Sequence, residues 1–174
     1  MKKFFKKGFT LTILTLLIAL NSVNSYASIN TKKEDGKDKT IVDIAVKDER
    51  FTTLVKALQE ADLVDTLKDD GPFTVFAPTD DAFKKLGADK INELLKPENK
   101  GTLKDILLYH VNGKNLLAKD VVKLNGKELN MLNGKDAKIE VKNNEVYIDG
   151  AKIIITDIIA KNGVIHVIDT VMIP

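Results

Sequence analysis

The sequence has no cysteine and no tryptophan, and it has only two histidines and four prolines in 174 residues. Without cysteine there is no disulfide framework, no thiol nucleophile and no thiolate zinc site. The serines Ser22, Ser25 and Ser28 precede the presumed domain, which argues against a serine hydrolase. His110 and His166 form no HExxH motif and no i, i+4 pair. The sequence therefore predicts a protein that is not an enzyme and that holds no metal and no cofactor.

A large excess of charge of either sign is also missing. The formal net charge is +2, but four of the 27 basic residues lie in residues 1–27. Without that segment, 23 basic residues face 25 acidic ones, which gives −2. Because a slightly acidic domain does not neutralise phosphates, we expect no nucleic acid partner.

The longest apolar stretch, residues 9–20, is too short to span a bilayer, which takes about 20 apolar residues. A basic segment precedes it, and Ser25-Tyr26-Ala27 provides small residues at the −3 and −1 positions of a cleavage site. We interpret residues 1–27 as a signal peptide of bacterial type, cleaved after Ala27. The alternative is an uncleaved membrane anchor. The cleaved chain would be secreted, extracellular or periplasmic, without membrane insertion. The polar residues 28–39 are expected to form a flexible linker.

Helices are predicted mainly in the first half of the remaining chain, residues 40–174. Thr40 is a suitable N-cap for residues 41–45, and Thr79 can cap a helix that follows a buried strand at residues 73–77. The apolar positions with helical spacing are Phe51, Leu54, Val55 and Leu58; Leu63, Val64 and Leu67; Phe83 and Leu86; Ile91, Leu94 and Leu95; and Leu103, Ile106, Leu107 and His110.

Strand signals dominate after Gly113. The alternating residues on either side of Asn143-Asn144 predict a hairpin, and apolar runs follow the turns Asp149-Gly150 and Asn162-Gly163. Val121-Val122 falls in the same strand-rich half. Helices followed by strands indicate an α+β domain with antiparallel sheets.

One predicted helix carries the candidate binding residues. His110 follows the apolar stripe of that helix, so we expect a buried imidazole bonded to the backbone, and we expect the same of His166. Tyr109 lies four residues after Asp105, which would place both on an outer face of the helix. An exposed pair of this kind suits a protein contact. The alternative is an ordinary surface Asp105 beside a half-buried Tyr109.

Three segments resemble the fasciclin-type adhesion domain (fasciclin I family). They are FTVFAPTDDAF at residues 73–83, LLYHV at residues 107–111 and NGVIHVIDTVMIP at residues 162–174. Their order and spacing fit one complete domain over residues 40–174. The resemblance implies a fasciclin-like α+β fold in which helices pack on antiparallel sheets to form a wedge or sandwich.

The resemblance also implies adhesion. Family members contact matrix or cell-surface proteins, and in animal members integrin binding has been attributed to positions that match Asp105-Ile106 and Tyr109-His110. Helical geometry favours Asp105 and Tyr109 as the contacting pair, with Ile106 and His110 supporting the helix from beneath. We therefore expect a non-catalytic adhesion or matrix-interaction module whose partner is a protein or a polysaccharide.

The number of domains bears on this expectation. One domain bridges two surfaces only if it has two binding faces or self-associates, so weak self-association is a further expectation. The alternative function is a periplasmic or extracellular carrier with a small ligand in a pocket between the sheet and the helices.

Overall fold

The computed structural model describes residues 38–174; the predicted signal peptide and nearly all of the predicted linker lie outside these residues. The described helices are α1 Ile41–Lys47, η2 Glu49–Phe51, α2 Thr52–Glu60, α3 Asp80–Leu86, α4 Ala88–Leu94, η3 Pro97–Asn99, α5 Lys100–Leu108 and α6 Ala118–Val122. The described strands are β1 Phe73–Pro78, β2 Val111–Asn112, β3 Glu128–Asn130, β4 Asp136–Lys142, β5 Glu145–Ile148, β6 Ala151–Ala160 and β7 Gly163–Ile168. Helices precede most strands, so the predicted α+β class is confirmed.

The strands form a seven-stranded sheet in the order β2-β1-β7-β6-β5-β4-β3. The predicted hairpin is present as β4 and β5, and β6 and β7 are antiparallel as well. The pair β1 and β7 is parallel, with Phe73 opposite Gly163 and Pro78 opposite Ile168. The sheet is therefore mixed, and the prediction that all strands are antiparallel is wrong for the central pair β1 and β7. Short turns specify hairpins, whereas the long connection between β1 and β7 leaves their relative direction to tertiary packing.

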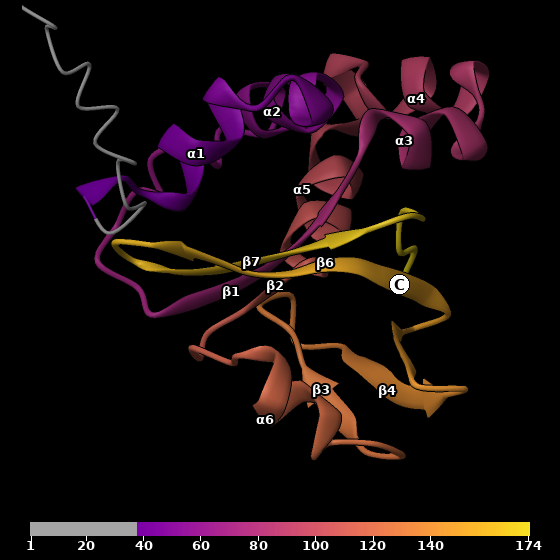
Figure 1. Cartoon of the computed structure of the whole chain (residues 1–174). Helices are drawn as coiled ribbons and strands as arrows, with labels where there is room; N and C mark the ends of the chain where they lie inside the picture. Colours follow the sequence, from indigo (N-terminus) through magenta and orange to yellow (C-terminus); the bar gives the residue numbers. More distant parts are fainter. Residues whose placement is uncertain (1–37) are drawn as a thin grey trace, which may run out of the picture. The chain divides into compact units, whose positions relative to one another are not determined.

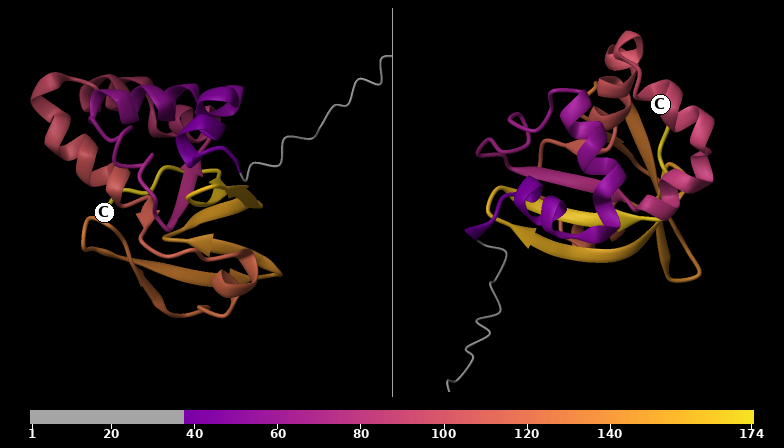
Figure 2. Two further views of the ribbon diagram at one scale, coloured as in Figure 1. Left: turned by 90° about the vertical axis from the view of Figure 1, so that its left-hand side faces the viewer. Right: turned by 90° about the horizontal axis from the view of Figure 1, so that it is seen from above.

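Two apolar cores lie on opposite faces of β1 and β7. Val75 and Ala77 of β1 pack with the helices, whereas Phe76 packs with strands β3 to β6. Figure 1 shows α1 to α4 on one side of these central strands and β3, β4 and α6 on the other. The two further views in Figure 2 show the same layers from the side and from above. The fold is a helical layer, a central sheet section and a curled strand layer.

The predicted caps are present. The Thr40 hydroxyl accepts a hydrogen bond from the Asp43 N–H, and the Asp43 carboxylate accepts one from the Thr40 N–H, so the pair forms a capping box at the start of α1. The Thr79 hydroxyl accepts from the Ala82 N–H at the start of α3. Both caps satisfy backbone donors that a helix leaves unpaired at its first turn.

Residues 61–70 form turns and not the predicted helical continuation. The buried Asn162 amide, in the turn between β6 and β7, donates to the carbonyls of Leu67 and Asp69 at 2.8 Å each, and its oxygen accepts from the Ile41 N–H at 2.9 Å. These carbonyls are thus bonded by a side chain from the far end of the chain.

Val121-Val122 lies in helix α6 and not in a strand. The N–H of Ala118, at the start of this helix, donates to the carboxylate of Asp157 in β6 at 2.8 Å. A tertiary cap therefore overrides the strand preference of the two valines.

Candidate interaction surface at the end of α5

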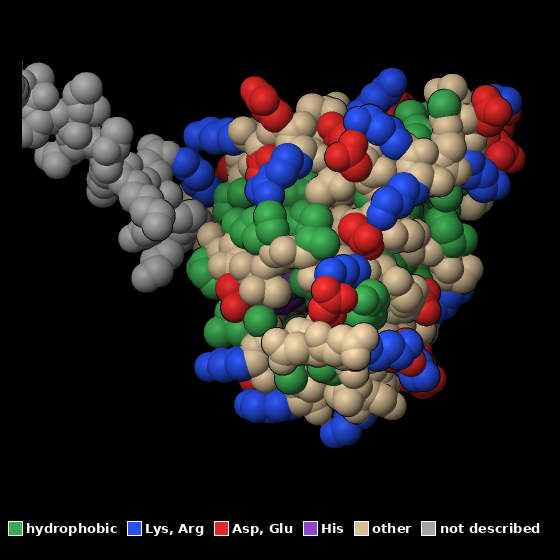
Figure 3. All heavy atoms as spheres, turned by 45° about the vertical axis from the view of Figure 1, so that its right-hand side comes forward, with side chains coloured by type: hydrophobic (Ala, Val, Ile, Leu, Met, Phe, Trp, Pro, Cys, Tyr) green, Lys and Arg blue, Asp and Glu red, His purple; other side chains and the backbone are tan. Residues whose placement is uncertain are grey.

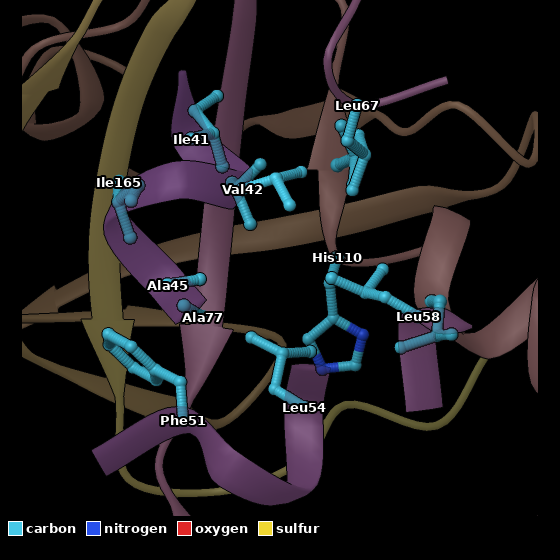
Figure 4. Close-up of a pocket in the computed structure, with 13 residues that line it drawn as sticks. Ile41, Val42, Ala45, Phe51, Leu54, Leu58, Leu67, Ala77, His110 and Ile165 are labelled. Atoms are coloured by element: carbon cyan, nitrogen blue, oxygen red, sulfur yellow. The ribbon is translucent and has the colours of Figure 1, made fainter. Parts of the chain in front are cut away.

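Helix α5 points the two expected supporting residues inward. Ile106 and His110 are buried in the core beneath the helix, as the apolar stripe predicted. Figure 4 shows the His110 ring beside Leu54 and Leu58, among apolar side chains that converge from α1, α2 and the sheet. Neither residue is available at the surface to contact a macromolecule directly.

The His110 ring links α5 to the C-terminal segment. The Met172 N–H donates to Nε2 at 3.0 Å, so Nδ1 carries the proton and donates to the Ile106 carbonyl at 2.8 Å. Burial lowers the pKa of His110 to about 4, because a charged imidazolium is poorly solvated in this core. The expected core imidazole bonded to backbone groups is confirmed.

His166 is held in the same manner from the opposite half of the domain. Its Nε2–H donates to the Leu116 carbonyl at 2.8 Å, and Nδ1 accepts from the Asp157 N–H at 3.3 Å. Burial lowers its pKa, and the ring lies 5.6 Å from that of Phe76. The expectation of a buried, backbone-bonded His166 is confirmed as well.

The expectation that Tyr109 is exposed is wrong. Its side chain is only 3% exposed and packs in the strand-side core. The hydroxyl donates to the Asp136 carbonyl at 3.0 Å and lies 3.1 Å from an Asp149 carboxylate oxygen. Desolvation, and secondly the Asp149 charge, raise the pKa of Tyr109 to about 12. Tyr109 keeps helical backbone angles, and its N–H donates to the Asp105 carbonyl at 3.0 Å, so it shares the helix face of Asp105. It is buried because the strand layer, through Asp136 of β4 and Asp149 after β5, covers that face at Tyr109.

Tyr109 and His110 therefore act together as a structural pair. The tyrosine enters the strand-side core, whereas His110 lies against the helix-side core. Two consecutive side chains thus tie the end of α5 to both layers of the domain.

Asp105 remains at the surface, as expected. Its carboxylate is 41% exposed and accepts from the Lys135 ammonium at 3.0 Å and from the Asn133 amide at 3.2 Å. Asn133 and Lys135 belong to the turn between β3 and β4, in which Leu132 is also exposed. We call these four residues the α5-turn surface. It combines one exposed apolar side chain with charged and amide groups.

Asn133-Gly134 is a turn-forming pair, so the sequence alone indicates a turn there but not the position of that turn against Asp105. The two segments are 28 residues apart, and no local pattern connects them. The turn signal showed that Asn133 would be near the surface, and that was the only available indication.

The space between the helices and the sheet is nearly filled. The cavity there, lined by apolar residues and His110, measures about 20 Å³ (Figure 4). Small-molecule pockets measure about 300–1,000 Å³, and one water needs about 10–15 Å³. The carrier hypothesis expects a ligand pocket between the sheet and the helices, but the cavity found there is only large enough for about one water molecule.

The described surface mixes charges of both signs. Figure 3 shows cationic and anionic side chains interspersed over one face of the molecule. Within residues 38–174, no three acidic or imidazole side chains gather into a group that could hold a metal ion. No helix of this part of the chain is long and apolar enough to cross a membrane.

These features define an α+β domain with a helical layer and a strand layer, pinned together at the end of α5. A sequence model of the Fasciclin domain matches residues 49–174, and the chain belongs to this family. The matched range includes the three segments that carried the resemblance, residues 73–83, 107–111 and 162–174. These segments contain β1, the end of α5 and β7.

Relatives of this chain occur in bacteria and animals. Protein sll1483 of Synechocystis is 41% identical over 167 residues, which cover 96% of this chain and 91% of that protein. The transforming growth factor-beta-induced protein ig-h3 of Sus scrofa is 38% identical over 135 residues, which cover 78% of this chain but only 19% of that protein.

A solved structure supports the fold independently. A domain pair from the insect cell adhesion molecule fasciclin I superposes with a TM-score of 0.68 at 23% identity, covering 78% of this chain and 51% of that one.

Proposed function

We propose that this protein is a secreted, non-catalytic interaction module that binds an extracellular matrix or cell-surface protein. A polysaccharide is the alternative partner. The Fasciclin family match over residues 49–174 carries this proposal. Similarity to the ig-h3 protein and, in fold, to an insect cell adhesion molecule supports it. The signal peptide proposed for residues 1–27 would export the chain.

The histidine chemistry supports a non-catalytic role. Both nitrogens of His110 and of His166 are bonded to backbone groups, so neither ring offers a free base. The sequence provides no thiol, and its serines lie at positions 22–28, before the domain.

Within this proposal the α5-turn surface is the contact site. Asp105 and Lys135 supply the charges, and the exposed Leu132 supplies apolar area in the same turn as Lys135. Tyr109, Ile106 and His110 hold the helix end in place from beneath. The roles that the resemblance suggested for these three residues are thus proposed to be positional; of the four residues that it named, Asp105 is the one in direct contact.

The test uses protein purified from the exported fraction of cells that express the full chain. It is immobilised, and binding to matrix proteins, polysaccharides and the envelope of the producing cell is measured. For the variant Asp105→Ala with Lys135→Ala we expect at least about tenfold weaker binding, which corresponds to about 1.4 kcal/mol. The matched control is Asp81→Ala with Lys84→Ala, an exposed ion pair on α3.

Three results would contradict the proposal. Absence of binding to every surface tested, by a protein that is monomeric in solution, would contradict the interaction function itself. Equal weakening by both double variants would show that the effect is not local to the α5-turn surface. Unchanged affinity in both variants would place the contact elsewhere on the domain.

A further inference from the structure

A surface groove of about 450 Å³ lies between α1, α2 and the turns that follow α2. Its apolar lining consists of Val42, Val46, Val55, Leu58 and Val64. Val46 is 59% exposed, the most exposed large apolar side chain of the described residues. Figure 3 shows apolar side chains gathered near the start of the described chain, where α1 begins. The groove is therefore an accessible apolar surface, separate from the α5-turn surface.

The polar lining of the groove is mainly cationic. It includes Lys39, Lys47 and Lys68, against one acidic residue, Asp43. The Asp43 carboxylate accepts from the Thr40 N–H at 3.0 Å and from the Thr40 hydroxyl at 2.7 Å. These hydrogen bonds, and then the charges of Lys68 and Lys47, lower the pKa of Asp43. Within residues 38–174, no carboxylate forms an ion pair with Lys47 or Lys68.

Two of these lysines, Lys39 and Lys47, lie close to each other. Desolvation, and then the neighbouring charge of Lys47, lower the pKa of Lys39. Three lysines and one carboxylate line the groove, so the lining carries an excess of positive charge that attracts an anion. The groove thus offers an apolar floor together with a site of positive potential.

We propose that this groove binds a free single-chain amphiphile with an anionic carboxylate head, such as a long-chain fatty acid. The volume falls within the range of small-molecule pockets, which favours a ligand of that size over a folded protein. The apolar chain would cover the valines and Leu58, and the carboxylate would lie at Lys47 and Lys68. This site is independent of the proposed adhesion function, because none of its lining residues belongs to the α5-turn surface.

The test titrates sodium dodecanoate, below its micelle concentration, into ¹⁵N-labelled protein purified after export. The expected result is saturable amide shifts at Val46, Lys47, Val55 and Lys68. Dodecyltrimethylammonium, with the same chain and a cationic head, should bind at least about tenfold more weakly. Lys68→Glu should weaken dodecanoate binding by a similar factor, because it reverses one of the charges that attract the head.

A matched pair of variants tests the apolar floor. Val46→Asp places a charge in the groove, whereas Val122→Asp makes the same change at a 44% exposed valine on α6. Dodecanoate affinity should fall at least about tenfold in the first variant and stay unchanged in the second. The amide spectra of both variants establish that each is folded.

Several outcomes would overturn the proposal. Equal binding of the anionic and cationic amphiphiles would show that the lysines do not select the head group. Amide shifts confined to residues outside the groove would show that the ligand binds elsewhere. Equal effects of the two aspartate variants would show non-specific association. Vesicles of anionic lipid that bind the protein while free dodecanoate does not would identify a membrane-docking surface instead. None of these results bears on the matrix-binding test at Asp105 and Lys135.

Discussion

Protonation of His110 should destabilise the folded domain below neutral pH. The imidazole is buried, and both of its nitrogens are bonded to backbone groups of α5 and of the C-terminal segment. Nε2 accepts a hydrogen bond from the Met172 N–H. A proton on Nε2 would therefore replace this hydrogen bond with two N–H donors that face each other. The folded state therefore binds this proton only at low pH, whereas the unfolded chain binds it near the ordinary histidine pKa.

The magnitude follows from the two pKa values. The pKa of His110 is about 4 in the folded domain and about 6.5 in an unfolded chain. Above pH 6.5 the ring is neutral in both states, and its contribution to stability is fully present. As the pH falls from 6.5 to 4, the unfolded state gains the proton first, and stability is lost progressively. The total loss is about 3 kcal/mol at about 1.4 kcal/mol per pKa unit.

The assay is denaturant unfolding at a series of pH values between 8 and 4, with the free energy of unfolding extrapolated to water. The control is His110→Gln, whose amide can accept from Met172 and donate to Ile106 but does not titrate. His166 and the carboxylates titrate in both proteins, so the difference between the two pH profiles isolates His110. We expect the wild-type curve to fall by about 3 kcal/mol more than that of the variant.

Parallel pH profiles of the two proteins would refute this reasoning. An NMR titration gives a second check, because the His110 ring signals of the folded protein should show no transition above pH 5. A transition near pH 6.5 would mean that the ring is not held neutral by burial.

The remaining predictions concern a buried hydroxyl, a close backbone approach and a helix cap. Tyr109→Phe loses the hydroxyl bonds to Asp149 and to a carbonyl, so unfolding should cost about 1–2 kcal/mol less, with partner binding unchanged because the ring is buried. Gly163→Ala would place a Cβ 2.0 Å from the Phe73 carbonyl oxygen, and calorimetry should show a loss above about 3 kcal/mol or no folded protein; a near-normal melting temperature would contradict that contact. Thr40→Ala removes the N-cap of α1 and should cost about 1 kcal/mol in denaturant unfolding; an unchanged midpoint would show that the cap is dispensable.

Much of the fold could be predicted from the sequence, because it depends on interactions between residues that are close together along the chain. Thr79 marked the start of α3, and the turn Asn143-Asn144 marked the β4–β5 hairpin. The apolar stripe through Leu103 and Ile106 correctly oriented α5 and buried His110. These features rest on residues that lie within a few positions of one another.

The candidate site was only partly readable. Asp105 was correctly placed at the surface, but Tyr109 was not, because the strand layer covers the part of the helix face where Tyr109 lies. The partners Asn133 and Lys135 come from a turn whose approach to α5 no local pattern specifies.

The sequence by itself determined most of the elements, the family and the inward direction of both histidines, because caps, turns and apolar periodicity act over one or two helical turns. Tertiary structure alone decided that β1 and β7 run parallel, that Asp157 caps α6 and that Tyr109 is buried. Each of these outcomes depends on groups tens of residues apart that meet only when the two apolar cores close on either face of the sheet.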